Sequence, residues 1–225
     1  MPDGDDPSRA EASVKGQPQA AVKEPVWTRS QALRTKAYWF LVLGFMFISL
    51  PAGTLFIHMV PYFQDKGLSP ASAASALSTY ALGVLAGRAV WGYTVTRLGI
   101  HYSLVAIGIS YGAAVFMFNL ASGAPAIFAS NFILGITIGG VQQIQAQAWP
   151  DYFGRNIVGA LTGFSTVMMA PVHGVGPLLA AFMYDATKSY FALYSFFAIL
   201  SFVAGLFFFL ARRPTPPVQK EASVS

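Results

Sequence analysis

The sequence predicts an all-α membrane protein whose chain crosses the bilayer six times. Between residues 37 and 211, only eight of the 175 residues are acidic (Asp, Glu) or basic (Lys, Arg), and seven of these fall at breaks between long apolar runs. A run of about 20 apolar residues can cross the hydrocarbon core as a helix. The runs lack the alternation of barrel strands, and a lipid-exposed backbone must satisfy its own hydrogen bonds, which helices achieve. These eight residues are Asp65, Lys66, Arg88, Arg97, Asp151, Arg155, Asp185 and Lys188.

Each apolar run is expected to form one spanning helix. In chain order the runs cover residues 37–63, 70–96, 101–120, 125–149, 157–184 and 190–211. Pro70 and Pro125 stand where a helix starts, and a proline without its N–H costs nothing at that position. The six helices are expected to form one bundle spanning residues 37–211.

Glycine spacing predicts where helices approach closely, and prolines predict where they bend. Gly83 with Gly87, and Gly159 with Gly163, are pairs of small residues four apart, a spacing that allows two helix backbones to come together. Pro51 lies inside the first run and is expected to bend that helix.

The basic residues predict the orientation. Six of them precede the first run and five more belong to the same side, whereas the opposite side holds only Lys66 and Lys188. By the positive-inside rule, both termini are expected in the cytoplasm, for a multi-pass protein of the inner or plasma membrane. Residues 1–36 are expected to be a disordered tail with a short amphipathic start at 28–36, and residues 212–225 a second tail. The net charge of +5 is distributed in this way, so no basic patch remains for nucleic acid.

Enzymatic chemistry is not expected. The chain has no cysteine and three histidines, with no acid inside a span and no ligand pair at metal-binding spacing such as His-Glu-x-x-His. No serine has a recognisable base and orienting acid, and no phosphate-binding loop is present. We therefore expect no catalytic site, no cofactor and no metal.

The loop between the second and third runs carries a specific pattern. It reads Gly87-Arg88-Ala-Val-Trp-Gly92-Tyr-Thr-Val-Thr96-Arg97-Leu-Gly99. This resembles the G-R-x-x-x-G-x-x-x-D-R-x-G signature of the major facilitator superfamily, in the copy that joins helices eight and nine of twelve. Thr96 stands where the family usually has aspartate, so the carboxylate of the family's cytoplasmic salt bridge is missing. The resemblance implies that the loop takes part in gating, through Gly87, Gly92, Arg97 and Gly99.

Other stretches resemble one branch of that family, the oxalate/formate antiporters and monocarboxylate porters. Residues 150–155, which end in Arg155, are similar to its loop between helices ten and eleven, residues 171–185 to its eleventh helix, and residues 58–62 to the outer end of its seventh. The resemblance covers helices seven to twelve, with residues 1–36 as a remnant of the central loop. It implies one half, a 3+3 inverted repeat, of a secondary active transporter that moves a small organic anion, such as a monocarboxylate, by alternating access.

One half of such a transporter cannot enclose a path alone, and three explanations stay open. The first is that the chain is a fragment. The second is that it is a half-transporter, which pairs with an N-terminal six-helix half or with a second copy. The third is a non-transporting six-helix membrane protein that acts as a partner or scaffold.

Arg88 is the first candidate binding residue. It lies 18 residues into its run, which is about 27 Å at ~1.5 Å per residue. A cation at such depth costs about 2.5 kcal/mol or more and normally faces a bundle interior, a cavity or a partner. Arg88 either binds a substrate carboxylate or a partner's acid through its planar fork, or it reaches the headgroups and braces the loop.

Two histidines are further candidates. His58 lies near the outer end of the first run, and His173 continues a face with Thr166 between the helix-bending residues Pro171 and Pro177. A histidine in a span can titrate near neutral pH and couple a proton to the substrate, or it can be a neutral partner of a neighbouring helix. We favour His173, because its helix resembles one that lines the cavity.

The fourth run carries side-chain amides. Asn131 and Gln142 are eleven residues apart, or three helical turns, and so share one face. They are expected either to read a polar substrate or to form interhelical hydrogen bonds worth about 0.6 kcal/mol each. Gln145 and Gln147, nearer the inner surface, are expected to be structural.

Overall fold

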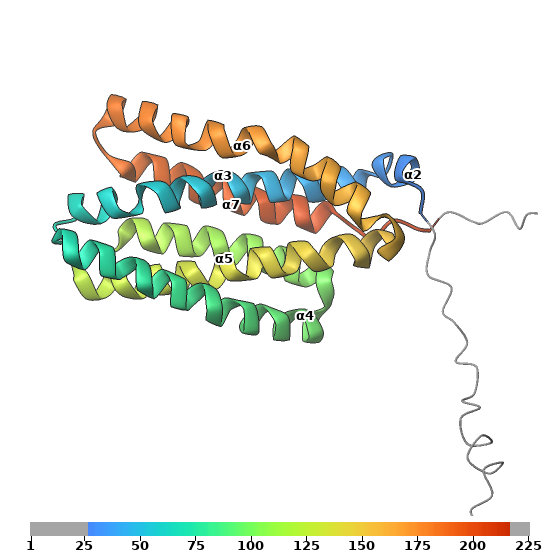
Figure 1. The fold of residues 1–225 in the computed structure, drawn as a ribbon, viewed down its shortest axis with the longest axis horizontal. Helices are drawn as coiled ribbons and strands as arrows, with labels where there is room; N and C mark the ends of the chain where they lie inside the picture. The colour runs from blue at the N-terminus through green and yellow to red at the C-terminus, as the bar shows by residue number, and fades with distance from the viewer. Residues whose placement is uncertain (1–26, 217–225) are drawn as a thin grey trace, which may run out of the picture.

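The computed structural model describes residues 27–216, and every regular element within them is a helix. Five helices are long and apolar enough to cross a membrane. Figure 1 shows them side by side, nearly parallel to the long axis of the molecule. The elements are α2 (Arg29–Leu33), α3 (Lys36–Asp65), α4 (Pro70–Leu120), α5 (Ala124–Phe153), the 3-10 helix η1 (Arg155–Ile157), α6 (Val158–Thr187) and α7 (Tyr190–Leu210).

Helix α4 contains two antiparallel arms. It has 51 residues, which would extend for about 76 Å if straight, far more than one crossing of the bilayer needs. Gly99 interrupts it with φ 75° and ψ 166°, a conformation that glycine adopts without the steric cost of a Cβ. The chain reverses there, as Figure 1 shows. The bundle therefore consists of six apolar rods, consistent with part of a major facilitator fold.

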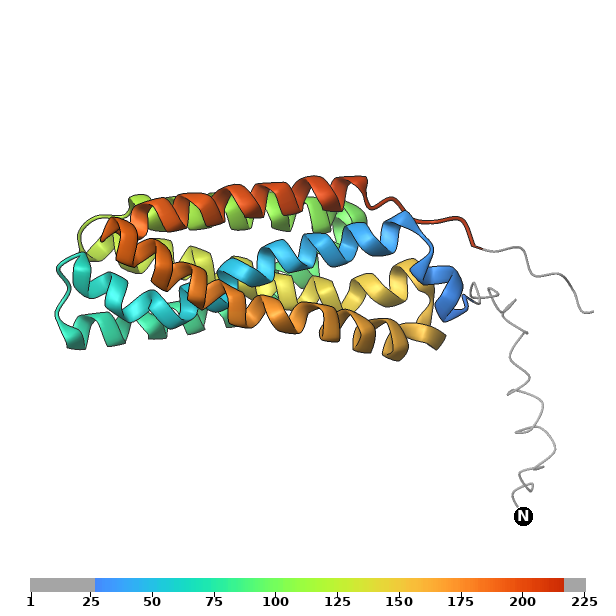
Figure 2. The same ribbon diagram turned by 90° about the horizontal axis from the view of Figure 1, so that it is seen from above.

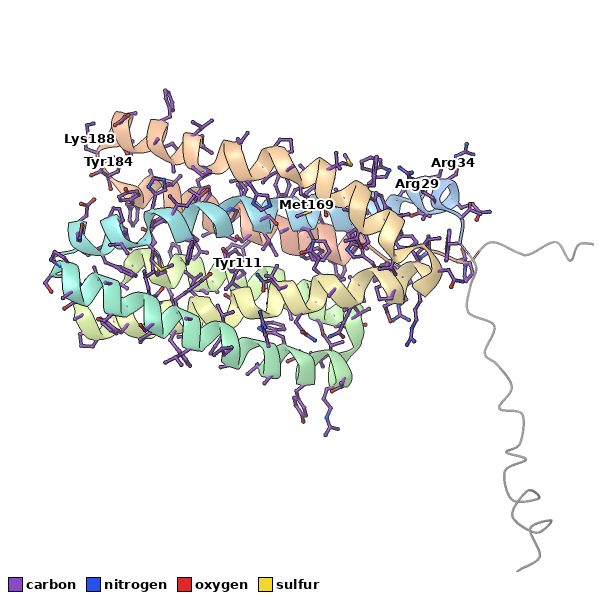
Figure 3. All side chains as sticks on the ribbon, viewed as in Figure 1. Arg29, Arg34, Tyr111, Met169, Tyr184 and Lys188 are labelled. Atoms are coloured by element: carbon purple, nitrogen blue, oxygen red, sulfur yellow. The ribbon has the colours of Figure 1, made fainter. Side chains whose placement is uncertain are left out.

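The two ends of the bundle differ in charge. The end where α3 begins, α4 reverses and α7 finishes carries arginines, and we call it the basic end. Its one described carboxylate is Asp151, whereas the opposite end, called the far end, carries Asp65, Asp185, Lys66 and Lys188 and no arginine among the described residues. Figure 3 labels Arg29 and Arg34 at the basic end, and Tyr184 and Lys188 at the far end.

The described chain begins ahead of the predicted bundle boundary at residue 37. Thr28 caps α2 by accepting a hydrogen bond from the Gln31 backbone N–H at 3.3 Å, and the Gln31 side chain accepts one from the Thr28 backbone at 3.0 Å. The Trp27 ring packs edge-on against Phe153, with centroids 5.6 Å apart. At the other terminus, residues 212–216 form no helix. The predicted disorder of residues 1–26 and 217–225 lies outside the described residues.

Glycines bring α4 and α5 into direct backbone contact. A Cβ added at Gly87 would lie 2.2 Å from the carbonyl oxygen of Ile136 on α5, and one at Gly83 would be equally obstructed by a backbone oxygen, at 2.3 Å. The close approach predicted for this pair is therefore present. Gly159 and Gly163 on α6 meet no described atom within 4 Å, so the same expectation is wrong for them within residues 27–216, because they lie on an uncovered face.

Helix α6 is the least covered of the rods. In its most apolar stretch 22% of the residues are buried, against 44–56% in the other spans. It packs closely on α3 at Gly176, where a Cβ would lie 2.3 Å from the Thr54 hydroxyl oxygen. One side of α6 thus packs on α3, and no described residue of 27–216 covers much of the opposite side.

We predict that Gly87→Ala destabilises the bundle, because the new methyl group would overlap a carbonyl oxygen that cannot move without its helix. Overpacking of this kind costs about 1–3 kcal/mol. The matched control is Gly92→Ala in the same helix, where a Cβ meets nothing within 4 Å. Thermal unfolding of the purified chain in detergent should show a lower midpoint for Gly87→Ala only; equal midpoints for the two variants would contradict the backbone contact.

Candidate functional site

A cavity of about 700 Å³ opens among α3, the first arm of α4, α5 and α6. This volume lies in the range of sites for small molecules. Met169, one of its lining residues, lies between the two charged ends of the bundle in Figure 3. No residue of α7 lines the cavity. Its polar lining consists of Ser49, Tyr80, Arg88, Gln142, Gln145, Thr166 and His173.

Arg88 supplies positive charge to this cavity. Its side chain is exposed, and within residues 27–216 no ion pair or hydrogen bond joins it to another group. The described carboxylates, Asp65, Asp151 and Asp185, all stand at helix ends. A guanidinium in the middle of a bundle is stable only with water, an anion or an acid facing it. The described residues provide no such acid.

Helix α6 brings Thr166 and His173 to the same cavity. The imidazole lies beside α3, since its Nδ1 atom is 3.7 Å from the place where Gly53 would carry a Cβ, an ordinary van der Waals separation. The Thr166 hydroxyl donates its proton to the carbonyl of Thr162 at 2.9 Å. It therefore presents an acceptor to the cavity.

Helix α5 contributes Gln142, as expected, and also Gln145, which was expected to be structural. The Gln145 amide lies 3.9 Å from the sulfur of Met169 across the α5–α6 boundary. Tyr80 on α4 is a second lining residue that the sequence interpretation did not include. The helical spacing could have identified both residues. Gln145 is three residues after Gln142 and Tyr80 is about two helical turns before Arg88, so each shares a helix face with a predicted site residue.

Two predicted binding residues lie outside the cavity. Asn131 is buried on α5, and its amide donates to the carbonyl of Ala76 and lies 3.5 Å from the Thr79 hydroxyl. It therefore ties α5 to α4. His58 lies toward the far end, with Nδ1 3.5 Å from the hydroxyl of Tyr190. The structure thus brings Arg88, Gln142, Thr166 and His173 together, and separates Asn131 and His58 from them.

The loop signature occupies the reversal of α4 at the basic end. Arg97 donates from Nε to the Tyr93 hydroxyl at 3.1 Å, and its guanidinium lies 5.2 Å from the centroid of the same ring. The hydroxyl of Thr96 donates to the Tyr93 carbonyl. Arg97 thus contacts an aromatic ring of its own helix, and Thr96 stands where the family pattern has a carboxylate. Arg155 begins η1 and, with Gly99, lines a separate hollow at this end.

Among residues 27–216, no group of three histidine, aspartate or glutamate side chains is placed to hold a metal ion. The arrangement that the cavity does offer is one cation surrounded by amides, hydroxyls and an imidazole. These groups suit the recognition of a small polar anion.

Comparison with known proteins identifies the family. The Major Facilitator Superfamily model matches residues 5–172 and, in an overlapping match, residues 40–224. The chain therefore belongs to the Major Facilitator Superfamily, a family of transporters and not of enzymes, and is a multi-pass integral membrane protein. Monocarboxylate transporter 2 of Mesocricetus auratus is 24% identical over 169 residues, which are 73% of this chain and 34% of that protein. The chain spans about a third of the length of this curated relative.

We predict that the cavity is accessible to water. The chain has no cysteine, so single cysteines can be labelled without background. Gln142→Cys and His173→Cys should react with a water-soluble maleimide roughly tenfold or more faster than Thr54→Cys, because labelling needs an accessible thiolate. Thr54 is fully buried beside the cavity wall on α3 and serves as the control. Equal, slow labelling at all three positions in vesicles would show that the cavity is dry.

Proposed function

We propose that the chain is a six-helix lobe, corresponding to the C-terminal half, of a secondary active transporter for a small organic anion such as a monocarboxylate. The observation that carries the proposal is the cavity in which an uncompensated Arg88 faces neutral polar groups. In this proposal the two inverted three-helix repeats rock as one lobe. Both termini lie in the cytoplasm, in accordance with the basic end.

Arg88 is proposed to bind the carboxylate of the substrate. A guanidinium presents two parallel N–H groups that match the two oxygens of a carboxylate, and the pair is strengthened where water is scarce. None of the three described carboxylates pairs with Arg88, so the substrate anion would be its counterion. The 24% identity to a monocarboxylate transporter supports the same class of substrate.

Gln142, Thr166 and His173 are proposed to complete the site. The Gln142 amide can donate to an anion, and Thr166 offers an acceptor because its own proton is already used. The His173 imidazole lines the same cavity and can donate a hydrogen bond to the anion from one ring nitrogen. Asn131, in contrast, is proposed to act through helix packing, since its amide is bonded to α4.

The open side of the cavity favours the presence of a second six-helix lobe. Its walls on α4 and α6 are exposed, and the uncovered small residues Gly159 and Gly163 would allow another helix to approach closely. The partner is proposed to be an N-terminal six-helix half or a second copy of this chain. Closing of the two lobes around the anion would give alternating access.

We predict that Arg88→Ala abolishes carboxylate uptake by the chain reconstituted with its complementary six-helix half, or alone if two copies pair. Loss of a charge-assisted contact should reduce uptake by at least about tenfold, and Arg88→Lys, which keeps the charge but loses the fork, should retain part of it. Uptake of a radiolabelled monocarboxylate into vesicles is the measurement. Arg34→Gln, an exposed arginine at the basic end, is the matched control and should transport normally.

Undiminished uptake in Arg88→Ala would reject Arg88 as the anion site while leaving transport itself established. Absence of uptake with either partner would instead favour a non-transporting membrane protein that acts as a partner or scaffold.

A further inference from the structure

Another hollow lies away from the central cavity, at the basic end between the second arm of α4 and the end of α7, and it shares Arg213 with the hollow lined by Gly99 and Arg155. It has a volume of about 370 Å³ and is lined by His101, Tyr102, Phe209, Arg212 and Arg213. None of these residues lines the central cavity. In Figure 2, α7 (red) and α6 (orange) lie on opposite edges of the bundle at the basic end and come together at the far end. This hollow, the α4–α7 groove, therefore belongs to the face away from the exposed side of α6.

Two arginines stand at the mouth of the groove and differ in their contacts. Arg213 forms an ion pair with Asp151 at the end of α5, which places its guanidinium. Arg212 is exposed, and among the described residues no carboxylate lies within ion-pair distance of it. One guanidinium is therefore held in place, and the other has its donors available for an anion.

A hydrogen-bonded chain fixes the two walls relative to each other. The Tyr152 hydroxyl donates to the carbonyl of Ala211 at 2.6 Å, so its oxygen accepts from Nδ1 of His101 at 3.1 Å. This assigns the proton to Nδ1 and leaves Nε2 of His101 as the ring nitrogen without a partner among the described residues. The end of α7 and the start of the second α4 arm are thus joined through α5, and the groove is a built feature.

An apolar surface continues from the groove along the two helices. Tyr102 is 67% exposed, and Phe209 is 50% exposed. Further exposed apolar residues follow at helical spacing on the same two rods, namely Ile109 on α4 and Leu206 and Phe202 on α7. In a membrane protein this surface meets lipid. A free inorganic anion would make no contact with this apolar surface, whereas the acyl chain of a lipid would pack against it.

We propose that the α4–α7 groove binds an anionic phospholipid, with its phosphate held by Arg212 and Arg213 and an acyl chain along the surface from Tyr102 and Phe209. Guanidinium–phosphate contacts are charge-assisted and can be bidentate. Basic pockets between spanning helices bind anionic headgroups by this chemistry. The site does not depend on the transport proposal, because it shares no residue with the central cavity.

The test is native mass spectrometry of the full chain, purified in detergent and titrated with dioleoylphosphatidylglycerol. The wild-type chain should hold one such lipid more tightly than dioleoylphosphatidylcholine, which has no net charge. Arg212→Gln should bind dioleoylphosphatidylglycerol about tenfold more weakly, since one charge-assisted contact is lost. Arg212→Lys should retain most of the affinity, because it keeps the charge. Arg34→Gln, which removes an exposed arginine of the same end, should bind as the wild type does.

Three results would overturn the proposal. The first is equal affinity of Arg212→Gln and Arg34→Gln for dioleoylphosphatidylglycerol, and the second is equal binding of the two lipids by the wild type. The third is displacement of the lipid by inorganic phosphate at the same concentration, which would make the groove an ion site. Circular dichroism of each variant checks that the helices remain intact, and the Arg212→Lys arm separates loss of charge from loss of fold.

Discussion

Direct contact between helix backbones is the constraint on which the rest of this structure depends. Lipid provides no hydrophobic force to drive one spanning helix against another, so association relies on close packing. Gly83 and Gly87 allow the first arm of α4 to touch α5, and Gly108 does the same against Gly205 where the second arm meets α7. These contacts hold one wall of the central cavity and one wall of the α4–α7 groove in place.

The placement of polar groups follows from the absence of water in the hydrocarbon core of the membrane, where a polar group must find its hydrogen-bond partner within the protein. Two buried amides inside the bundle donate to carbonyls of neighbouring helices: Asn131 donates to Ala76 and Asn119 donates to Phe191. The ion pairs among the described residues lie at the two ends. Arg88 departs from this order, since it is charged, distant from the ends and without a described partner. The proposed anion site rests on that departure, because a cation at such depth normally faces a cavity, a partner or a bundle interior.

The two faces of the lobe thus have different chemistry. On the α6 side, polar side chains line an open cavity, and α6 has the largest share of its surface uncovered. On the α7 side, the exposed side chains are apolar along the helices, and at the basic end they give way to Arg212 and Arg213. The backbone contacts between the rods therefore separate two surfaces. One is the polar cavity, which faces water or a second lobe, and the other is the apolar surface, which faces lipid.

The sequence by itself determined the helical class, the six apolar segments and the family, because the bilayer imposes a length and a composition on every span. It also indicated the glycine contact of Gly87 and the set Arg88, Gln142, Thr166 and His173, since helical spacing places residues on faces. Only the tertiary structure decided which faces meet. It turned Asn131 toward α4, placed His58 against α7, brought Gln145 and Tyr80 into the cavity and left Gly159 and Gly163 uncovered. Periodicity gives the direction of a side chain around its own helix, whereas the neighbour on that side depends on how all six rods pack.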